Sequence, residues 1–216
     1  MEKKIITIVG MGPLISFSVA ARFAEEGYAV AMIARNEDKL KELKERLADK
    51  GFEANYFTGD ASSEVSLRKA IARIHEEMGT TSVLFYNAAN IRRANLLEES
   101  FDQLINDFKV NVAGALTAVK AVYPFMRDAN QGSILITGGG LSIDPHPDYA
   151  SLSIGKAGIR NFTHSLARSL VNSNVYVGTL IIRDFVKAGK EKYNPVNIAA
   201  EFYKMHMDKK LIELEY

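Results

Sequence analysis

The sequence predicts an α/β protein: a single domain in which a doubly wound parallel sheet of about seven strands carries helices on both faces. Short apolar segments rich in β-branched residues alternate along the chain with longer segments whose apolar residues recur every three or four positions. The short segments are apolar almost throughout, which is typical of parallel strands buried on both faces. No stretch rich in proline, glycine or serine divides the 216 residues, so we expect one domain over residues 1–216.

The first strand, helix and strand are predicted at the amino terminus. Residues 4–9 (KIITIV) form a β-branched run of strand length, and a helix over 14–26 follows it. Gly27, directly after this helix, is the residue type that most often ends helices in a left-handed conformation. Residues 28–34 (YAVAMIA) form the second strand, which completes the first β–α–β unit.

The next two helices are predicted from apolar residues that share one face. A charged helix over 37–50 ends at Gly51, and a strand over 52–58 leads to a helix over 64–78. The apolar positions of these two helices are Leu40, Leu43, Leu47, Leu67, Ile71, Ile74 and Met78.

The second half of the chain continues the alternation. Further strands are expected at 82–86, 133–137, 175–182 and 211–214. Further helices are expected at 98–109, 112–127, 153–171 and 196–206. The helix over 153–171 has an apolar stripe that serves either the core or a contact between subunits, formed by Ile159, Phe162, Leu166 and Leu170.

The composition narrows the possible partners. The chain has 27 Lys+Arg against 26 Asp+Glu, and both signs are spread along it rather than gathered in the basic stripe of a nucleic-acid-binding protein. It has no cysteine, which suits a reducing compartment, and no HxxxH, HExxH or clustered carboxylate pattern for a metal. We therefore expect a cytoplasmic protein that binds neither nucleic acid nor metal.

The amino terminus imitates a signal peptide, because a basic segment over residues 1–4 precedes an apolar run. Gly10, Gly12 and Pro13 interrupt this run, and Arg22 arrives before it is long enough to span a bilayer. We expect neither secretion nor membrane insertion.

A glycine-containing turn follows the first strand, with the sequence Val9-Gly10-Met11-Gly12-Pro13-Leu14-Ile15-Ser16. In a doubly wound sheet this turn and the start of the next helix face the pyrophosphate of a dinucleotide. Gly10 is placed for the tight turn and Gly12 adds conformational freedom, so both are candidate cofactor contacts. Leu14 and Ser16 stand where a close approach to phosphate favours glycine, and the loop equally fits a plain strand-to-helix turn.

Several motifs, in this order, resemble those of the short-chain dehydrogenase/reductase family. The opening VGMGPLIS resembles the family's VGAGPGLG loop, and Asp60 after the third strand resembles its adenine-contacting aspartate. Phe85-Tyr86-Asn87-Ala88-Ala89 is similar to the NNAG motif, and Asn111-Val112-Ala113-Gly114 to the NVxG element. Lys156 in SIGKAG matches the family's lysine, so the resemblance covers nearly the whole chain.

The resemblance implies a Rossmann-type fold and an NAD(P)-dependent oxidoreductase that transfers hydride between nicotinamide and a small carbonyl or alcohol substrate. Relatives commonly pair through the helix over 153–171, so a homo-oligomer is expected. Asp60 also fits a helix cap or turn residue, and Asn87 a residue that closes a strand end. The implied cofactor-lining positions are Gly10, Ile15, Asp60, Asn87, Ala88 and Lys156.

Arg35 bears on the choice of cofactor. An acidic residue at the end of the second strand holds the ribose 2′-OH of NAD, whereas an arginine there pairs with the 2′-phosphate of NADP. The chain has Ala34-Arg35-Asn36 at this point, which favours NADP over NAD. The alternative is a solvated arginine at the start of a loop.

The family's catalytic residues are only partly present. In the family a tyrosine four residues before the lysine donates the proton, a serine polarises the same oxygen and an asparagine holds a relay water. Asn111 and Lys156 match this arrangement, but the tyrosine position is Leu152 and the serine position is Gly139. The sequence therefore predicts that ordinary catalysis by this family is impaired.

Tyr149 is the candidate substitute proton donor. It precedes Leu152 by three residues, so its hydroxyl approaches the same space if the helix begins early enough. The alternative is a tyrosine that packs a loop against the sheet. His146 lies near the expected site between two prolines, where surface exposure or local hydrogen bonding also explains it.

Ile182 and Arg183 stand where relatives usually have Pro-Gly beside the nicotinamide. Arg183 would place a cation beside the cofactor or an anionic substrate, or it is simply a solvated strand end. The short connection to the last helix leaves little room for substrate-covering helices, so we expect an open cleft.

Two interpretations of the function remain open from the sequence. The first is an oxidoreductase with a rearranged proton donor, and the second is a non-catalytic nucleotide-binding or scaffolding protein of the same fold. The retained Asn111, Lys156, Asp60 and Asn87 favour the first. Leu14 and Ser16 favour the second, and no residue pattern identifies the substrate.

Overall fold

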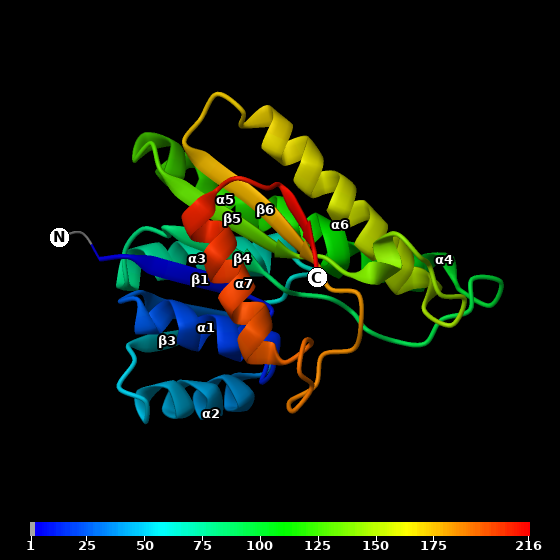
Figure 1. Cartoon of the computed structure of the whole chain (residues 1–216), viewed down its shortest axis with the longest axis horizontal. Helices are drawn as coiled ribbons and strands as arrows, with labels where there is room; N and C mark the ends of the chain where they lie inside the picture. Colours follow the sequence, from blue (N-terminus) through cyan, green and yellow to red (C-terminus); the bar gives the residue numbers. More distant parts are fainter. Residues whose placement is uncertain (1–2) are drawn as a thin grey trace.

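The centre of the protein is a parallel sheet, whose strands lie side by side through the middle of Figure 1. The computed structural model describes residues 3–216, so the first two residues of the basic segment lie outside it. Within these residues the strands are β1 (Ile5–Val9), β2 (Ala29–Ala34), β3 (Ala54–Thr58), β4 (Val83–Tyr86), β5 (Gly132–Thr137), β6 (Val175–Ile181) and β7 (Glu213–Glu215). They pair in the order β3-β2-β1-β4-β5-β6-β7, and every pairing is parallel. The order reverses between β1 and β4, where doubly wound sheets bind their ligands.

Helices cover both faces of this sheet, as predicted (Figure 1). They are α1 (Ile15–Glu25), α2 (Glu37–Ala48), α3 (Glu64–Glu77), α4 (Phe101–Phe108), α5 (Gly114–Asp128), α6 (Ala150–Ser169) and α7 (Pro195–Asp208). One apolar layer contains buried side chains of α1, α2 and α7, and the other contains those of α3, α5 and α6. The doubly wound single-domain fold predicted from the sequence is confirmed.

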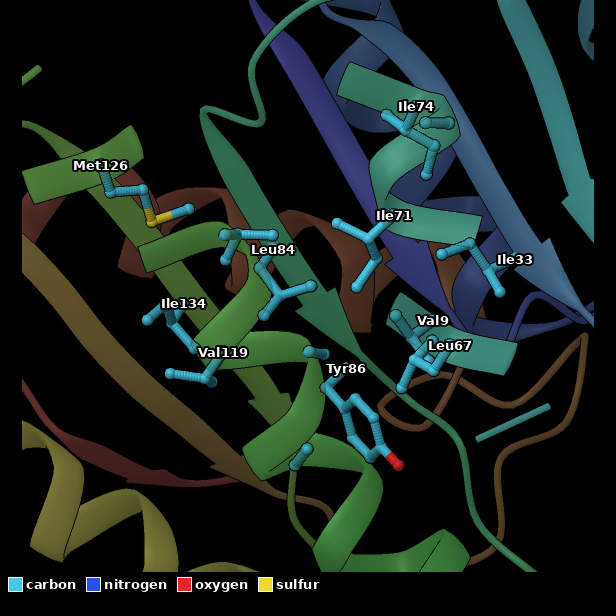
Figure 2. Close-up of a cluster of buried hydrophobic side chains, with 14 of the residues drawn as sticks. Val9, Ile33, Leu67, Ile71, Ile74, Leu84, Tyr86, Val119, Met126 and Ile134 are labelled. Atoms are coloured by element: carbon cyan, nitrogen blue, oxygen red, sulfur yellow. The ribbon is translucent and has the colours of Figure 1, made fainter. Parts of the chain in front are cut away.

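Figure 2 shows the apolar layer beneath α3 and α5. Side chains alternate between the two faces of a strand, so Val9 lies in this layer while Ile8 lies in the opposite one. The labelled side chains of α3 and α5 that pack here are Leu67, Ile71, Ile74, Val119 and Met126. The stripe on α6 also belongs to the core, because Ile159 and Leu170 are buried and Phe162 and Leu166 pack against the cluster.

Side-chain caps begin four of the described helices. The caps of α2, α3, α4 and α7 are Asn36, Ser63, Ser100 and Asn194. In contrast, α1 begins after Leu14 and α6 after Tyr149, and neither residue provides a side-chain cap. The first peptide N–H groups of α1 and α6 are therefore not bonded by a capping side chain.

Some boundaries differ from the sequence prediction. The helices expected at 98–109 and 112–127 form one continuous helical segment, because a π-helical turn (Lys109–Ala113) joins α4 directly to α5. β3 begins at Ala54 rather than at residue 52, since its pairing with β2 begins there. α6 begins at Ala150, three residues earlier than expected.

Within residues 3–216, no helix combines the length and the apolar character that crossing a bilayer would require.

Candidate functional site

A cleft of about 930 Å³ lies at the carboxyl ends of the central strands. Its walls come from the segments that follow each of the strands β1 to β6, together with the first residues of α1 and α6. All the residues predicted to contact a cofactor line this one cleft: Gly10, Gly12, Ile15, Arg35, Asp60, Asn87, Ala88 and Lys156. Residues spread over 147 positions of the sequence thus meet at the switch point of the sheet.

The turn after β1 requires glycine at Gly10. This residue has φ +87°, and a Cβ built on it would lie 2.4 Å from the backbone nitrogen of Ala88. The Ser16 hydroxyl donates to the Gly10 carbonyl at 2.8 Å, and the Asn87 Nδ2 group donates to the Ser16 hydroxyl at 2.7 Å. Ser16, which stands where relatives have glycine, is buried and stabilises the turn through these two hydrogen bonds.

Gly12 and Leu14 differ from Gly10 in their surroundings. A Cβ on Gly12 would meet no atom within 4 Å, so this position has open space. Leu14 is 46% exposed and, with Ile15, lines the cleft at the uncapped start of α1. This helix end presents peptide N–H groups and the positive end of the helix dipole, which suit an anion such as a pyrophosphate.

Asp60 and Arg35 lie at one end of the cleft. The Asp60 carboxylate accepts hydrogen bonds from the backbone and the hydroxyl of Ser62, both at 2.8 Å. Burial alone would raise the pKa of Asp60, but these bonds and the nearby charge of Arg35 hold it below its usual value. Arg35 is exposed, and within residues 3–216 its guanidinium makes no ion pair.

Lys156 lies at the other end, on α6. Its Nζ donates to the Thr137 carbonyl at 2.8 Å, and burial lowers the pKa of its amine to about 8. Gly139 lies beside it, since a Cβ on Gly139 would be 3.4 Å from Lys156 Cε. Leu152, one helical turn earlier, is buried and also lines the cleft. The positions of the family's serine and tyrosine, Gly139 and Leu152, thus bring no hydroxyl group to this end of the cleft.

Asn111 lies behind the cleft wall rather than on its surface. It is 4% exposed, does not line the cleft, and sits in the π-helical turn between α4 and α5. Its Oδ1 accepts from the backbone nitrogen of Asn90 at 2.7 Å, and a Cβ on Gly155 would lie 2.5 Å from its Nδ2. That Nδ2 has no hydrogen-bond partner among the described residues.

A buried polar network, not predicted from the sequence, lies next to Asn111. Asp107 accepts hydrogen bonds from the side chains of Asn90, Arg92 and Ser151, and Arg92 also pairs with Glu99. Burial alone would raise the pKa of Asp107, but these hydrogen bonds outweigh it and keep the pKa below its usual value. A signal was present, because Asp107 precedes Asn111 by about one helical turn and so shares its face.

Tyr149 lines the cleft together with Leu152 and Lys156. α6 begins at Ala150, directly after Tyr149, and the role of Tyr149 as a proton donor stays a prediction. His146 lines the cleft as well, with its ring 5.7 Å from that of Tyr149 and its Nδ1 accepting from the backbone nitrogen of Asp148 at 3.1 Å.

Arg183 follows β6 and lines the cleft near Gly140. The connection from Arg183 to Asn194 contains no helix or strand, and its residues Phe185 and Val186 also line the cleft. Among the described residues, no three His, Asp or Glu side chains are grouped closely enough to hold a metal ion.

Comparison with known protein families gives one match over most of the chain. Residues 4–187 match the family described as short chain dehydrogenase. The chain is 30% identical over 176 residues to 2,3-dihydro-2,3-dihydroxybenzoate dehydrogenase of Bacillus subtilis, covering 81% of this chain and 67% of that protein. It is also 30% identical over 183 residues to glucose 1-dehydrogenase of Gluconobacter oxydans, covering 82% of this chain and 67% of that protein.

Solved structures resemble the fold as a whole. A metagenomic short-chain oxidoreductase in complex with NADP superimposes with a TM-score of 0.87 at 20% identity, over 99% of this chain and 95% of that one. An actinorhodin polyketide ketoreductase variant with NADPH superimposes with a TM-score of 0.91 at 19% identity, over the same shares of the two chains.

Proposed function

The chain belongs to the short-chain dehydrogenase family, and on that premise we propose that it is an NADP-dependent oxidoreductase acting on a small carbonyl or alcohol substrate. The observation that carries the proposal is the meeting of all the predicted cofactor residues in one cleft at the switch point of the sheet. Relatives from the same family are named as dehydrogenases, and a neighbour of the same fold binds NADP.

The residues of the cleft fit a dinucleotide. The tight turn at Gly10 and the uncapped start of α1 suit the pyrophosphate, and Asp60, with its lowered pKa, remains an anionic acceptor for the adenine end. Arg35 would pair with a 2′-phosphate, because its guanidinium is exposed at the cleft. Asn87 and Ala88 would line the middle of the bound molecule, with Lys156 at the nicotinamide end.

Bound NADPH would supply a hydride to the carbonyl carbon. In this proposal Tyr149 donates a proton from its hydroxyl to the carbonyl oxygen, and Lys156 holds positive charge beside that oxygen. Because its pKa is about 8, Lys156 is mostly an ammonium ion at neutral pH. Asn111 acts from behind the wall by fixing the backbone at Asn90.

A second candidate function is a nucleotide-binding protein without catalysis. It is favoured by the surroundings of Lys156, where Leu152 and Gly139 offer no hydroxyl group. Both candidates place the dinucleotide in the same cleft, and they differ only in turnover.

The first experiment measures cofactor binding. We expect NADPH to quench protein fluorescence or release heat on titration, with a lower dissociation constant than NADH. Arg35→Ala should remove most of this preference while NADH binding stays unchanged. Equal binding of the two cofactors, or an Arg35→Ala variant with unaltered NADPH affinity, would contradict the NADP assignment.

The second experiment separates the two functions. The protein is incubated with NADPH and a panel of aldehydes and ketones, and oxidation of the cofactor is followed by the loss of NADPH absorbance. Turnover supports the oxidoreductase, and Tyr149→Phe should then lose most of the rate. NADPH binding without turnover of any carbonyl supports the second candidate.

The protein is also proposed to form a homo-oligomer. Helix α4 exposes the apolar side chains of Phe101, Ile105 and Phe108, which are spaced four and three apart and therefore share one face. The cytoplasmic location expected from the composition stays a prediction.

A further inference from the structure

Three consecutive glycines follow β5, and two of them, Gly139 and Gly140, lie beside Lys156 and Arg183. A Cβ on Gly139 would lie 3.4 Å from Lys156 Cε, and a Cβ on Gly140 would lie 3.2 Å from Arg183 Cα and 3.5 Å from its Cδ. A side chain at either position would occupy space beside one of these cationic residues. The glycines therefore leave both residues room to face the cleft that they line.

The backbone around Arg183 is held from two sides. The backbone nitrogen of Gly140 donates to the Ile182 carbonyl at 2.8 Å, and that of Arg183 donates to the Tyr216 carbonyl at 3.0 Å. The guanidinium has one long ion pair, 3.7 Å from a carboxylate oxygen of Glu215, which is 57% exposed. Exposed pairs of this kind contribute little to stability, so Arg183 remains available to a stronger anionic partner.

Lys156 and Arg183 are the two cationic side chains that line this end of the cleft. Asp184 is paired with Lys190 at 2.7 Å, which neutralises its charge locally. Asp144 is the remaining carboxylate that lines this end, against the two cations Lys156 and Arg183. Burial lowers the pKa of Lys156 only to about 8, so its positive charge persists at neutral pH.

Apolar side chains line the same end of the cleft. They are Ile91, Leu141, Leu152, Ile182, Phe185 and Val186. An apolar wall with a few charged groups is the usual composition of a site for a small amphipathic molecule.

Resting on the function proposed above, we propose that this cleft takes carbonyl compounds in which an apolar chain carries a carboxylate, and that Arg183 is the specificity-determining residue that pairs with it. The guanidinium can offer two parallel N–H donors to the two carboxylate oxygens. In the reaction, a bound NADPH would supply the hydride to the carbonyl carbon, and a proton from solvent would reach the oxygen through the site. The products are NADP⁺ and the hydroxy acid, and the carboxylate is unchanged.

The test compares ligands that differ only in charge. Hexanoate and hexanamide are titrated by ligand-observed NMR against the full chain, with and without saturating NADPH. We expect hexanoate to bind roughly tenfold more tightly than hexanamide, since hydrogen bonds to a charged group are stronger than those to a neutral amide. Arg183→Gln should abolish the difference, and Arg183→Lys should retain part of it. Arg127→Gln, which removes a surface arginine on α5, is the matched control and should change nothing.

Each result bears on the proposal separately from the reductase function. Equal affinities for the two ligands, or a preference that survives Arg183→Gln, would overturn it. So would an Arg183→Gln variant that loses NADPH affinity but keeps the preference for hexanoate, because Arg183 would then serve the cofactor. Turnover of an oxo acid and of its methyl ester at equal KM would overturn it while leaving the reductase function intact. A preference for carboxylate ligands in a protein that reduces no carbonyl would support the carboxylate site and contradict the reductase function.

Discussion

At the scale of single residues, Gly10 has the strictest requirement in the cleft. Its left-handed backbone and its contact with Ala88 both exclude a side chain, whereas Gly12 two positions later has open space around it. The sequence shows two glycines in one loop, and only the structure distinguishes their roles. The two positions therefore form a matched pair for mutagenesis.

We predict that Gly10→Ala destabilises the protein and weakens cofactor binding. A left-handed conformation costs a residue with a Cβ about 1–2 kcal/mol, and the overlap with the Ala88 nitrogen adds to this cost. Urea unfolding should show the loss, and Gly12→Ala should remain within about 0.5 kcal/mol of the wild type. Equal stability of the two variants would contradict the assigned turn.

Leu152 stands at the position of the family's catalytic tyrosine, so a substitution there can restore the missing phenol group. A tyrosine at this position would stand four residues before Lys156 on α6, at a site that already lines the cleft. We predict that Leu152→Tyr raises the rate of carbonyl reduction by about 10²-fold, because a positioned general acid contributes on that order. Leu152→Phe is the control without the hydroxyl. Equal rates in the two variants would show that proton donation does not limit the reaction.

At the scale of elements, α7 is joined to the sheet through His206. This buried histidine contacts the Tyr28 hydroxyl at 2.9 Å and the Ser133 hydroxyl at 2.8 Å. Burial lowers its pKa to about 4, with smaller contributions from the charges of Lys209 and Lys4. In the folded protein the ring therefore stays neutral well below pH 6.

This shift predicts a loss of stability in acid. The unfolded chain takes up the proton near pH 6.5, whereas the folded chain takes it up only near pH 4. The contribution of neutral His206 to the free energy of unfolding is fully present above pH 6.5. Up to about 3 kcal/mol of it is lost as the pH falls towards 4. Denaturant titrations at several pH values should show a shallower pH dependence in His206→Gln than in the wild type. Parallel curves would mean that His206 does not titrate as assigned.

The elements also show what the sequence could and could not predict. Apolar periodicity was sufficient to predict the alternation of strands and helices, because a buried face requires apolar residues at the period of a helix or a strand. The π-helical turn at 109–113 was not predictable in this way, since its residues fit an α-helix equally well. Its inward-facing Asn111 depends on contacts with Asn90 and the neighbouring Gly155, which are distant in the sequence.

At the scale of the whole molecule, the described residues form one sheet with helices on both faces and a cleft at its switch point. The exposed apolar face of α4 lies outside both apolar layers. Phe101 is 78% exposed, which is unusual for a large aromatic side chain in a monomer.

We predict that the protein in solution has a mass that is a multiple of the 23.9 kDa chain. Replacing Phe101 and Ile105 by glutamate should reduce that mass, because each buried contact would acquire a charge. Light scattering after size exclusion measures the mass. Val65→Glu on α3, where the apolar side chain is also exposed, is the control and should leave it unchanged. A monomeric wild type would contradict the proposed association.

The pairing of β1 with β4 has a consequence for the way the protein folds. Gly10 and the Asn87 side chain that holds its turn are 77 positions apart in the chain. Parallel neighbours so distant in sequence close large loops and pair slowly. During synthesis the ribosome therefore releases the amino-terminal part of the cleft long before its partner, and the nascent chain acquires its binding turn only when β4 has emerged and docked.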